Sequence, residues 1–169
     1  MKLKVAILTI IWPFLLDNIG FCQNLKVADF YAFTIHPKGL PVMVYDYINR
    51  DIVMKIMSNK QENNAGQVVH IIGVENNWFK LDKCLVDEDL WIKSGDLGVF
   101  ARNFHSTLIL FEKPELTSTK IQLSENNEIL IVKDFFEDWV SITTNINGVK
   151  YEGWLPKDKT CSSPFTTCP

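Results

Sequence analysis

The sequence lacks the residues on which the common enzyme and nucleic-acid-binding classes depend. No glycine-rich phosphate loop occurs in its 169 residues. His36, His70 and His105 have no acidic residue or cysteine at ligand spacing, so we interpret them as structural or solvent-facing rather than as zinc ligands. With 17 basic and 20 acidic residues, the chain also lacks the basic surface that phosphate binding needs. These absences predict no metal, no cofactor and no nucleic-acid partner.

Long apolar runs are scarce, and the main one lies at the N-terminus. Lys2 and Lys4 precede the apolar residues 5–16, and Gly20 and Cys22 place small side chains at −3 and −1 before Gln23. The run is shorter than the roughly 20 residues of a bilayer-spanning helix. It therefore predicts a signal peptide over 1–22 and a periplasmic or secreted mature chain without a transmembrane anchor. Lipidation of Cys22 is disfavoured, because Phe21 stands where bacterial lipoboxes carry a small residue.

Cysteine is also scarce, with four in the chain. Cys161 and Cys168 bracket a short Ser/Pro/Thr-rich tail, which predicts a disulfide loop in an oxidising compartment. Cys84 is then unpaired on an apolar stretch, where a lone thiol is usually a buried structural residue. A Cys–His protease is disfavoured, since no helix start signal surrounds Cys84 to activate a nucleophile.

A β-rich pattern ending in two spaced tryptophans occurs twice. Residues 69–81 align with 130–142, which places Trp78 over Trp139, and the flanking segments 42–45 and 90–92 align with 108–111 and 153–155. Each copy spans about 60 to 70 residues of short strands. A repeat of this kind is typical of small tandem binding domains.

Strand signals dominate the rest of the chain. Period-2 alternation and enrichment in β-branched and aromatic residues predict strands over 30–35, 42–47, 52–57, 68–74, 78–81, 90–93, 107–111, 128–132, 139–143 and 152–155. Asn147-Gly148 is a strong hairpin turn signal, because both residues tolerate positive φ. The pattern predicts an all-β protein.

The organisation predicted is a divergent first barrel over 23–100, a second barrel over 101–160 and a tail over 161–169. The joint near 94–98 is short and has no Pro- or Ser-rich linker character. Each copy is small for an independent core, so we expect the two barrels to pack against each other.

The second copy resembles the bacterial SH3-like (SH3b) domain. The residues that carry the resemblance are the apolar strand 108–111, Lys113-Pro114, 118–121, Asp134, Asp138-Trp139-Val140 and Glu152-Gly153-Trp154-Leu155. The first copy fits more loosely. Asn77 stands where an aspartate precedes the first tryptophan of the pattern, and Leu90 stands where a glycine precedes the second. The resemblance implies two tandem SH3-like β-barrels in an exported protein of Bacteroidetes type, and peptidoglycan stem peptides as the leading ligand class.

Aromatic residues at a barrel rim can form shallow stacking surfaces for peptides or sugars. Phe135 and Phe136 are consecutive, so in a strand one of the two must face solvent. The acidic turn beside them is interpreted as solvated rather than as an acid/base pair. The predicted ligand-binding residues are Phe111, Phe135, Phe136, Asp138, Trp139 and Trp154.

The predicted function is non-enzymatic binding of a cell-wall peptide or glycan. The alternative is a protein–protein interaction or scaffold module that recognises an envelope protein through an exposed sheet edge. A glycan binder should expose several coplanar aromatic rings, whereas a scaffold should expose one contiguous apolar patch.

Overall fold

A computed structural model describes residues 25–36, 40–46, 51–56, 65–82, 89–102, 107–123 and 128–163. The predicted signal peptide over 1–22, Cys84, His105 and Cys168 lie outside these residues. The strands are β1 (Lys26–Ile35), β2 (Val42–Tyr45), β3 (Ile52–Ile56), β4 (Ala65–Glu75), β5 (Trp78–Leu81), β6 (Trp91–Lys93), β7 (Leu97–Ala101), β8 (Leu108–Phe111), β9 (Lys120–Leu123), β10 (Leu130–Phe136), β11 (Trp139–Ile146), β12 (Val149–Pro156) and β13 (Thr160–Cys161).

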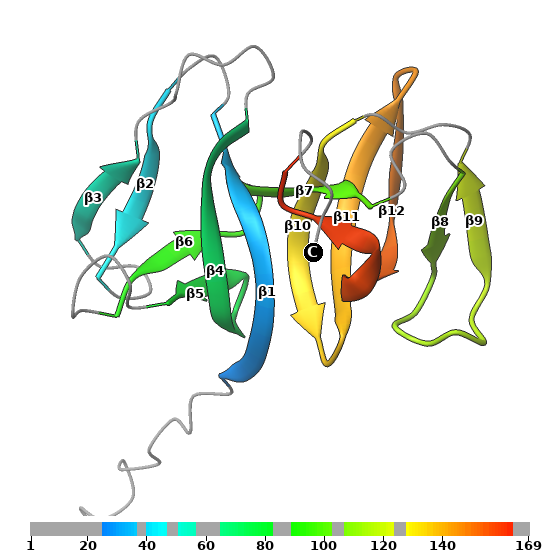
Figure 1. Ribbon diagram of the computed structural model, residues 1–169, viewed down its shortest axis with the longest axis horizontal. Coiled ribbons are helices and arrows are strands. Elements are labelled where there is room, and N and C mark those ends of the chain that lie inside the picture. The colour runs from blue at the N-terminus through cyan, green and yellow to red at the C-terminus, as the bar shows by residue number, and fades with distance from the viewer. Residues whose placement is uncertain are drawn as a thin grey trace, which may run out of the picture.

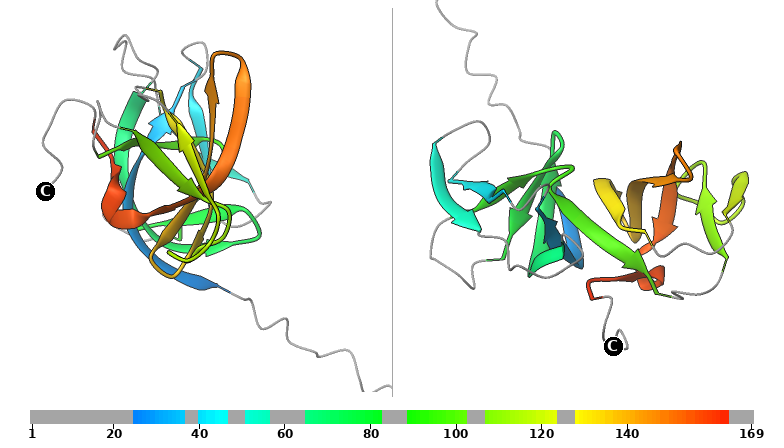
Figure 2. Two further views of the ribbon diagram at one scale, coloured as in Figure 1. Left: turned by 90° about the vertical axis from the view of Figure 1, so that its right-hand side faces the viewer. Right: turned by 90° about the horizontal axis from the view of Figure 1, so that it is seen from above.

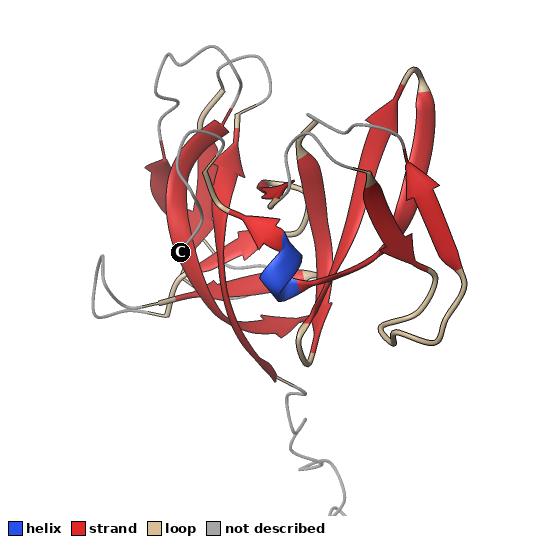
Figure 3. Ribbon diagram, turned by 45° about the vertical axis from the view of Figure 1, so that its right-hand side comes forward, coloured by secondary structure: helices blue, strands red, loops and turns tan. Residues whose placement is uncertain are grey.

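The prediction of an all-β protein is confirmed. Within the described ranges the only helical element is η2 (Lys157–Lys159), a single 3₁₀ turn drawn in blue in Figure 3. The Asn147-Gly148 turn between β11 and β12 is also confirmed, with φ of 54° and 81° at its two residues. Each of the ten predicted strands overlaps an observed strand, and β5 has the same bounds as its predicted strand.

The strands form one antiparallel sheet in the order β3-β2-β6-β5-β4-β1-β7-β10-β11-β12-β8-β9, with β13 added beside β7. From the centre of the sheet outward, the first six strands of the chain lie in the order β1-β4-β5-β6-β2-β3. The next six strands lie in the corresponding order on the other side, β7-β10-β11-β12-β8-β9. The sequence repeat is therefore also a repeat of topology. Below, the first copy means β1 to β6 and the second copy means β7 to β12.

The two copies meet at β7, which crosses between them in Figure 1. Gly98 on this strand lies opposite Phe33 of β1 and also opposite Ile131 of β10. Strand β7 was not predicted, because all five of its residues are buried and the period-2 alternation is lost. The segment 94–98 interpreted as a joint therefore runs into the central strand of the sheet, which includes its last two residues, Leu97 and Gly98.

The prediction of two closed barrels is not confirmed. The described pairings run from β3 to β9 as one sheet and do not close into a barrel. The reason is that β7 uses one edge for β1 and the other for β10, so hydrogen bonding continues from the first copy into the second. Figure 2 shows from above how this strand joins the two groups of strands.

One hydrophobic core spans both copies, as the short joint predicts. At its centre the rings of Phe30 on β1 and Phe135 on β10 stack at 5.0 Å with 5° between their planes. A smaller cluster of Phe33, Ile35, Phe100 and Cys161 packs separately. The two copies are therefore held together by buried apolar contacts as well as by strand pairing.

Candidate functional site

Each copy has a tight hairpin that places a tryptophan beside an aromatic residue from another strand. Trp78 begins β5 after the turn Asn76-Asn77, and Trp139 begins β11 after Glu137-Asp138. Asn76, Asn77 and Glu137 have positive φ values of 47°, 66° and 53°, which a two-residue hairpin turn requires. In both copies the turn accepts a backbone hydrogen bond of 2.8 Å from the residue after another strand: Ser94 N–H donates to the carbonyl oxygen of Asn77, and Lys157 N–H donates to that of Asp138.

The aromatic contacts repeat with the hairpins. Tyr45 meets Trp78 edge to face at 5.0 Å and 89°, and Phe111 meets Trp139 at 5.1 Å and 79°. The second tryptophan of each copy lies across from the same partners, Trp91 opposite Tyr45 and Trp154 opposite Phe111. The internal alignment of the sequence is thus reproduced in side-chain packing.

The copies differ at one position next to this aromatic pair. In the first copy Lys93 lies across from Trp78, and its Nζ is 5.2 Å from the ring centroids of both Tyr45 and Trp78. In the second copy the residue across from Trp139 is Pro156. The second copy has a lysine over its aromatic pair from a different strand, because Nζ of Lys120 on β9 lies 5.3 Å from the ring centroid of Phe111.

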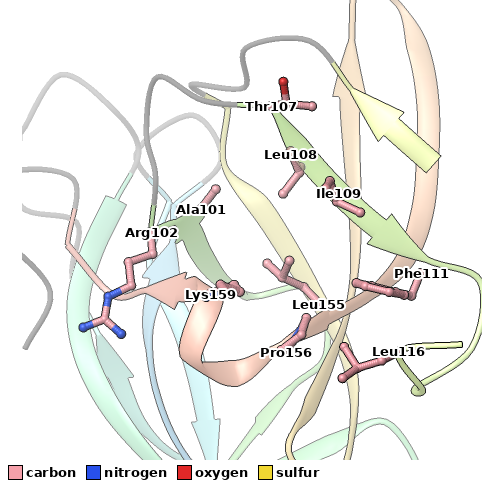
Figure 4. A pocket seen from close by; sticks show the side chains of 10 residues that line it. All are labelled: Ala101, Arg102, Thr107, Leu108, Ile109, Phe111, Leu116, Leu155, Pro156 and Lys159. Carbon is pink, nitrogen blue, oxygen red and sulfur yellow. The ribbon is translucent and has the colours of Figure 1, made fainter. Parts of the chain in front are cut away.

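Pro156 and Phe111 instead line an open groove of about 250 Å³, here called the β8 groove (Figure 4). Buried Leu108, Phe111 and Leu155 form its base. Ile109 and Leu116 add exposed aliphatic surface, with 41% and 69% of their area accessible to solvent. The lining residues are Ala101, Arg102, Thr107, Leu108, Ile109, Phe111, Leu116, Leu155, Pro156 and Lys159.

The predicted site residues do not all meet in one place. Phe111 lines the β8 groove, where Trp139 and Trp154 are its neighbours. Phe136 is 41% exposed and lies opposite Trp139 at the tip of the hairpin. Asp138 projects from the turn and pairs with Lys157 Nζ at 2.9 Å.

Phe135 is placed differently from the prediction for a ligand-contacting residue. Its ring is 1% exposed and packs on Phe30 in the shared core, so it cannot reach a ligand. The expectation that one of the two consecutive phenylalanines faces solvent is confirmed by Phe136.

Cys161 is buried on β13, opposite Phe100. Its disulfide with Cys168 stays a prediction, since Cys168 lies outside the described residues.

The sequence reasoning missed Ile109, Leu116, Arg102, Pro156 and Lys159 of the groove. Leu116 lies between β8 and β9, in a loop with no periodic pattern. The signal that could have found it is an apolar residue among charged and polar neighbours in the segment Glu112 to Ser118. Loop positions of that kind are frequent in binding sites carried by a rigid scaffold.

A second cluster of functional side chains surrounds His70 on β4. Its Nδ1 is 2.9 Å from Asp82 Oδ2 and its Nε2 is 3.0 Å from Asp29 Oδ1, while the ring of Tyr31 stacks on the imidazole at 4.5 Å. An imidazole can donate hydrogen bonds from both nitrogens only when it is protonated. Burial disfavours the charged ring, but the hydrogen bonds to Asp29 and Asp82 and their charges outweigh it and raise the pKa of His70.

This arrangement predicts a pH-dependent contribution to stability. Because the pKa of His70 is raised above 6.5 in the folded state, the stabilisation is complete below that value and is lost as pH rises through the folded-state pKa. The wild type should therefore lose stability relative to His70→Gln as pH rises from about 6 to about 8.5. We expect the difference in free energy of unfolding to fall by less than about 1 kcal/mol, because solvent screens the exposed Asp29. Urea unfolding of both proteins measures this difference, in which the other histidines cancel. A difference that does not change with pH would contradict it.

His36 is fully buried, and both of its ring nitrogens have hydrogen-bond partners. Its Nδ1 is 2.9 Å from the carbonyl oxygen of Leu40, and its Nε2 is 2.8 Å from Thr34 Oγ1, which accepts the N–H of Gln67 at 3.0 Å. A ring that donates from Nδ1 and accepts at Nε2 satisfies all these groups. The interpretation of His36 as structural agrees with this geometry.

In the described part of the chain, no group of three or more His, Cys, Asp or Glu residues is arranged to hold a metal ion. The same residues include no helix with the length and apolar character needed to cross a membrane.

No family model and no curated protein matches the sequence. Among solved structures, the chain is similar to NlpC2 and NlpC1 from Trichomonas vaginalis, each with 19% identity and a TM-score of 0.32 over 80% of this chain. The matched region covers 48% of NlpC2 and 46% of NlpC1, so the chain spans about half the length of either. A TM-score this low supports no conclusion about fold or function.

Proposed function

We propose that this protein is a non-enzymatic binding module of the cell envelope that holds an extended peptide segment of an envelope or secreted protein in its β8 groove. The observation that carries the proposal is the aliphatic surface of the groove. Ile109 and Leu116 expose apolar area beside a base of buried Leu108, Phe111 and Leu155. Burial of that area by an apolar side chain of the ligand would supply the binding free energy.

The kind of exposed side chain favours a peptide over a glycan. A sugar-stacking surface needs several exposed aromatic rings. Among the described residues of the second copy, the exposed large hydrophobic side chains are Ile109, Leu116, Val149 and Phe136, and only the last is aromatic. Two of the three aliphatic side chains line the β8 groove.

The difference between the copies supports binding by the second copy. The ammonium group of Lys93 lies over the aromatic pair of the first copy. At the equivalent position of the second copy, Pro156 and Phe111 border the open groove. A ligand therefore meets no cation at this position of the second copy, where the lysine over Phe111 is Lys120 of β9, 5.3 Å from the ring centroid.

The setting of this activity is also part of the proposal. The repeated strand order and hairpin geometry support two SH3-like copies that are joined through β7 and do not close into separate barrels. The basic and apolar N-terminal residues support export to the periplasm or beyond. Both points accord with a module that binds an envelope protein.

The groove predicts a specific loss of peptide binding in one variant. The test uses fluorescence anisotropy with fluorescein-labelled Gly-Ser-Val-Ala-Leu, whose C-terminal carboxylate is free. Leu116→Ser should weaken binding about tenfold, since one exposed leucine buried on binding contributes on the order of 1.5 kcal/mol. Val149→Ser is the matched control, because Val149 is 52% exposed and does not line the groove. No binding by the wild type, or equal losses in both variants, would overturn the proposal.

A second candidate is binding of insoluble peptidoglycan through the hairpin tip. The favouring observation is the exposed ring of Phe136 directly across β11 from the half-buried Trp139. Co-sedimentation with peptidoglycan that is lost in Phe136→Ala but kept in Leu116→Ser would favour this candidate over the peptide groove.

A further inference from the structure

The β8 groove has charge of only one sign. Among its ten described lining residues the charged side chains are Arg102 and Lys159, and none of the ten carries a carboxylate. Leu108, Phe111, Leu116, Leu155 and Pro156 make the rest of the surface mainly apolar. A ligand that is apolar along its length and negatively charged at one end complements this distribution.

Both cations stand at one end of the groove, where the backbone fixes them. Strands β7 and β13 pair through Ala101 and Thr160, and the N–H of Arg102 donates to the carbonyl oxygen of Lys159 at 2.8 Å. The two residues are therefore neighbours across adjacent segments. Figure 4 shows Arg102 at the opposite end of the groove from Phe111, with its guanidinium directed outward.

Arg102 also borders a second cavity, of about 300 Å³, between the two copies. We call it the junction cavity; it is lined by Asp29, Phe30, Tyr31, Arg102, Lys157, Asp158, Thr160, Cys161 and Ser162. The Nη1 of Arg102 donates to the carbonyl oxygen of Asp158 at 3.1 Å, which holds the guanidinium between the two hollows. The apolar groove thus leads at this end to a guanidinium and then into a second hollow, whose charged residues are Arg102, Lys157, Asp29 and Asp158.

We propose that the β8 groove recognises the C-terminal end of its peptide: the last apolar side chain lies against Phe111 and Leu116, and the terminal carboxylate is held by Arg102 and Lys159. A planar guanidinium matches a carboxylate with two parallel N–H donors, and such hydrogen bonds are stronger than neutral ones. Lys159 pairs with Asp158 at 3.2 Å on the exposed surface, and an exposed pair of this kind opens at little cost. This inference rests on the proposed function and adds the chemical class of the ligand.

The test compares fluorescein-labelled Gly-Ser-Val-Ala-Leu as the free carboxylate and as the C-terminal amide. The wild type should bind the amide about tenfold more weakly, and the difference should shrink as salt rises. Arg102→Gln should weaken binding of the carboxylate to about the level of the amide. Lys55→Gln makes the same change of charge at an exposed position of β3 and should leave both affinities unchanged.

The outcomes separate this inference from the function on which it rests. Equal affinity of the wild type for both peptides would overturn C-terminal recognition and leave peptide binding standing. A tenfold preference for the carboxylate that persists in Arg102→Gln would overturn the placement of the carboxylate at this end of the groove. Absence of binding of either peptide would overturn both proposals.

Discussion

Replacing Phe135 by alanine is expected to lower the free energy of unfolding by about 3–5 kcal/mol, which is the range for deleting a buried phenylalanine. The ring is 1% exposed and stacks on Phe30 at 5.0 Å. Phe30 belongs to the first copy and Phe135 to the second, so the substitution opens a cavity where the copies meet. Part of the loss is the stacking itself, worth about 0.5–1.5 kcal/mol beyond the buried area.

Phe136→Ala is the matched control, since it removes the same side chain from the next residue. Phe136 is 41% exposed, and the Nζ of Lys26 lies 5.9 Å from its ring centroid. We expect a loss of about 1 kcal/mol or less. Urea unfolding followed by tryptophan fluorescence measures both variants. Similar losses in the two would show that the copies are not held together by the Phe30–Phe135 contact.

Replacing Gly98 by valine is expected to cost about 3 kcal/mol, at the upper end of the range for overpacking. A Cβ at this position would lie 2.8 Å from Cε2 of Phe33 and 2.9 Å from Cγ2 of Ile129. Phe33 is buried and stacks on Phe100 at 4.8 Å, so its ring has little room to withdraw. Gly98 is therefore the position at which β7 fits between β1 and β10.

A double-mutant cycle with Phe33→Leu separates steric overlap from other effects of valine. Leucine lacks the Cε2 and Cζ atoms of the ring, so Gly98→Val should cost clearly less in the Phe33→Leu background. Urea unfolding of the four proteins measures the coupling. Equal costs in both backgrounds would mean that contact with Phe33 is not the cause.

Both substitutions bear on the proposed ligand site. Strand β7 ends at Ala101, and Arg102 follows it directly, so this strand positions one end of the β8 groove. A disturbed junction should therefore weaken peptide binding as well as stability. Leu116→Ser, by contrast, changes an exposed loop residue and should affect binding alone.

Local patterns were enough to predict the hairpins. Strand β5 matches its predicted bounds, and the Asn147-Gly148 turn lies where the dipeptide indicates. These features depend on neighbours in the sequence, such as alternation of side chains and tolerance of positive φ. The sequence also predicted that Tyr45 corresponds to Phe111 and Trp78 to Trp139. The structure agrees, because Tyr45 contacts Trp78 in the first copy as Phe111 contacts Trp139 in the second.

The binding residues were only partly predictable, because burial depends on distant partners. Phe135 and Phe136 are the same residue type in the same strand, and it is Phe30, about a hundred positions earlier, that covers the first of them. Leu116, Arg102 and Lys159 belong to three different segments that meet only when β7, β8 and β13 are in place. No local pattern links them.

The sequence by itself determined the all-β class, the internal repeat and the hairpins, because strand alternation and turn chemistry act over a few residues. Only the tertiary structure decided that Leu97–Ala101 is the shared central strand and that the second copy carries the open groove. The physical reason is that both depend on long-range contacts. Gly98 is small enough to let β1 and β10 pair with one strand, and Pro156 lies across from Trp139 where Lys93 lies across from Trp78 in the first copy.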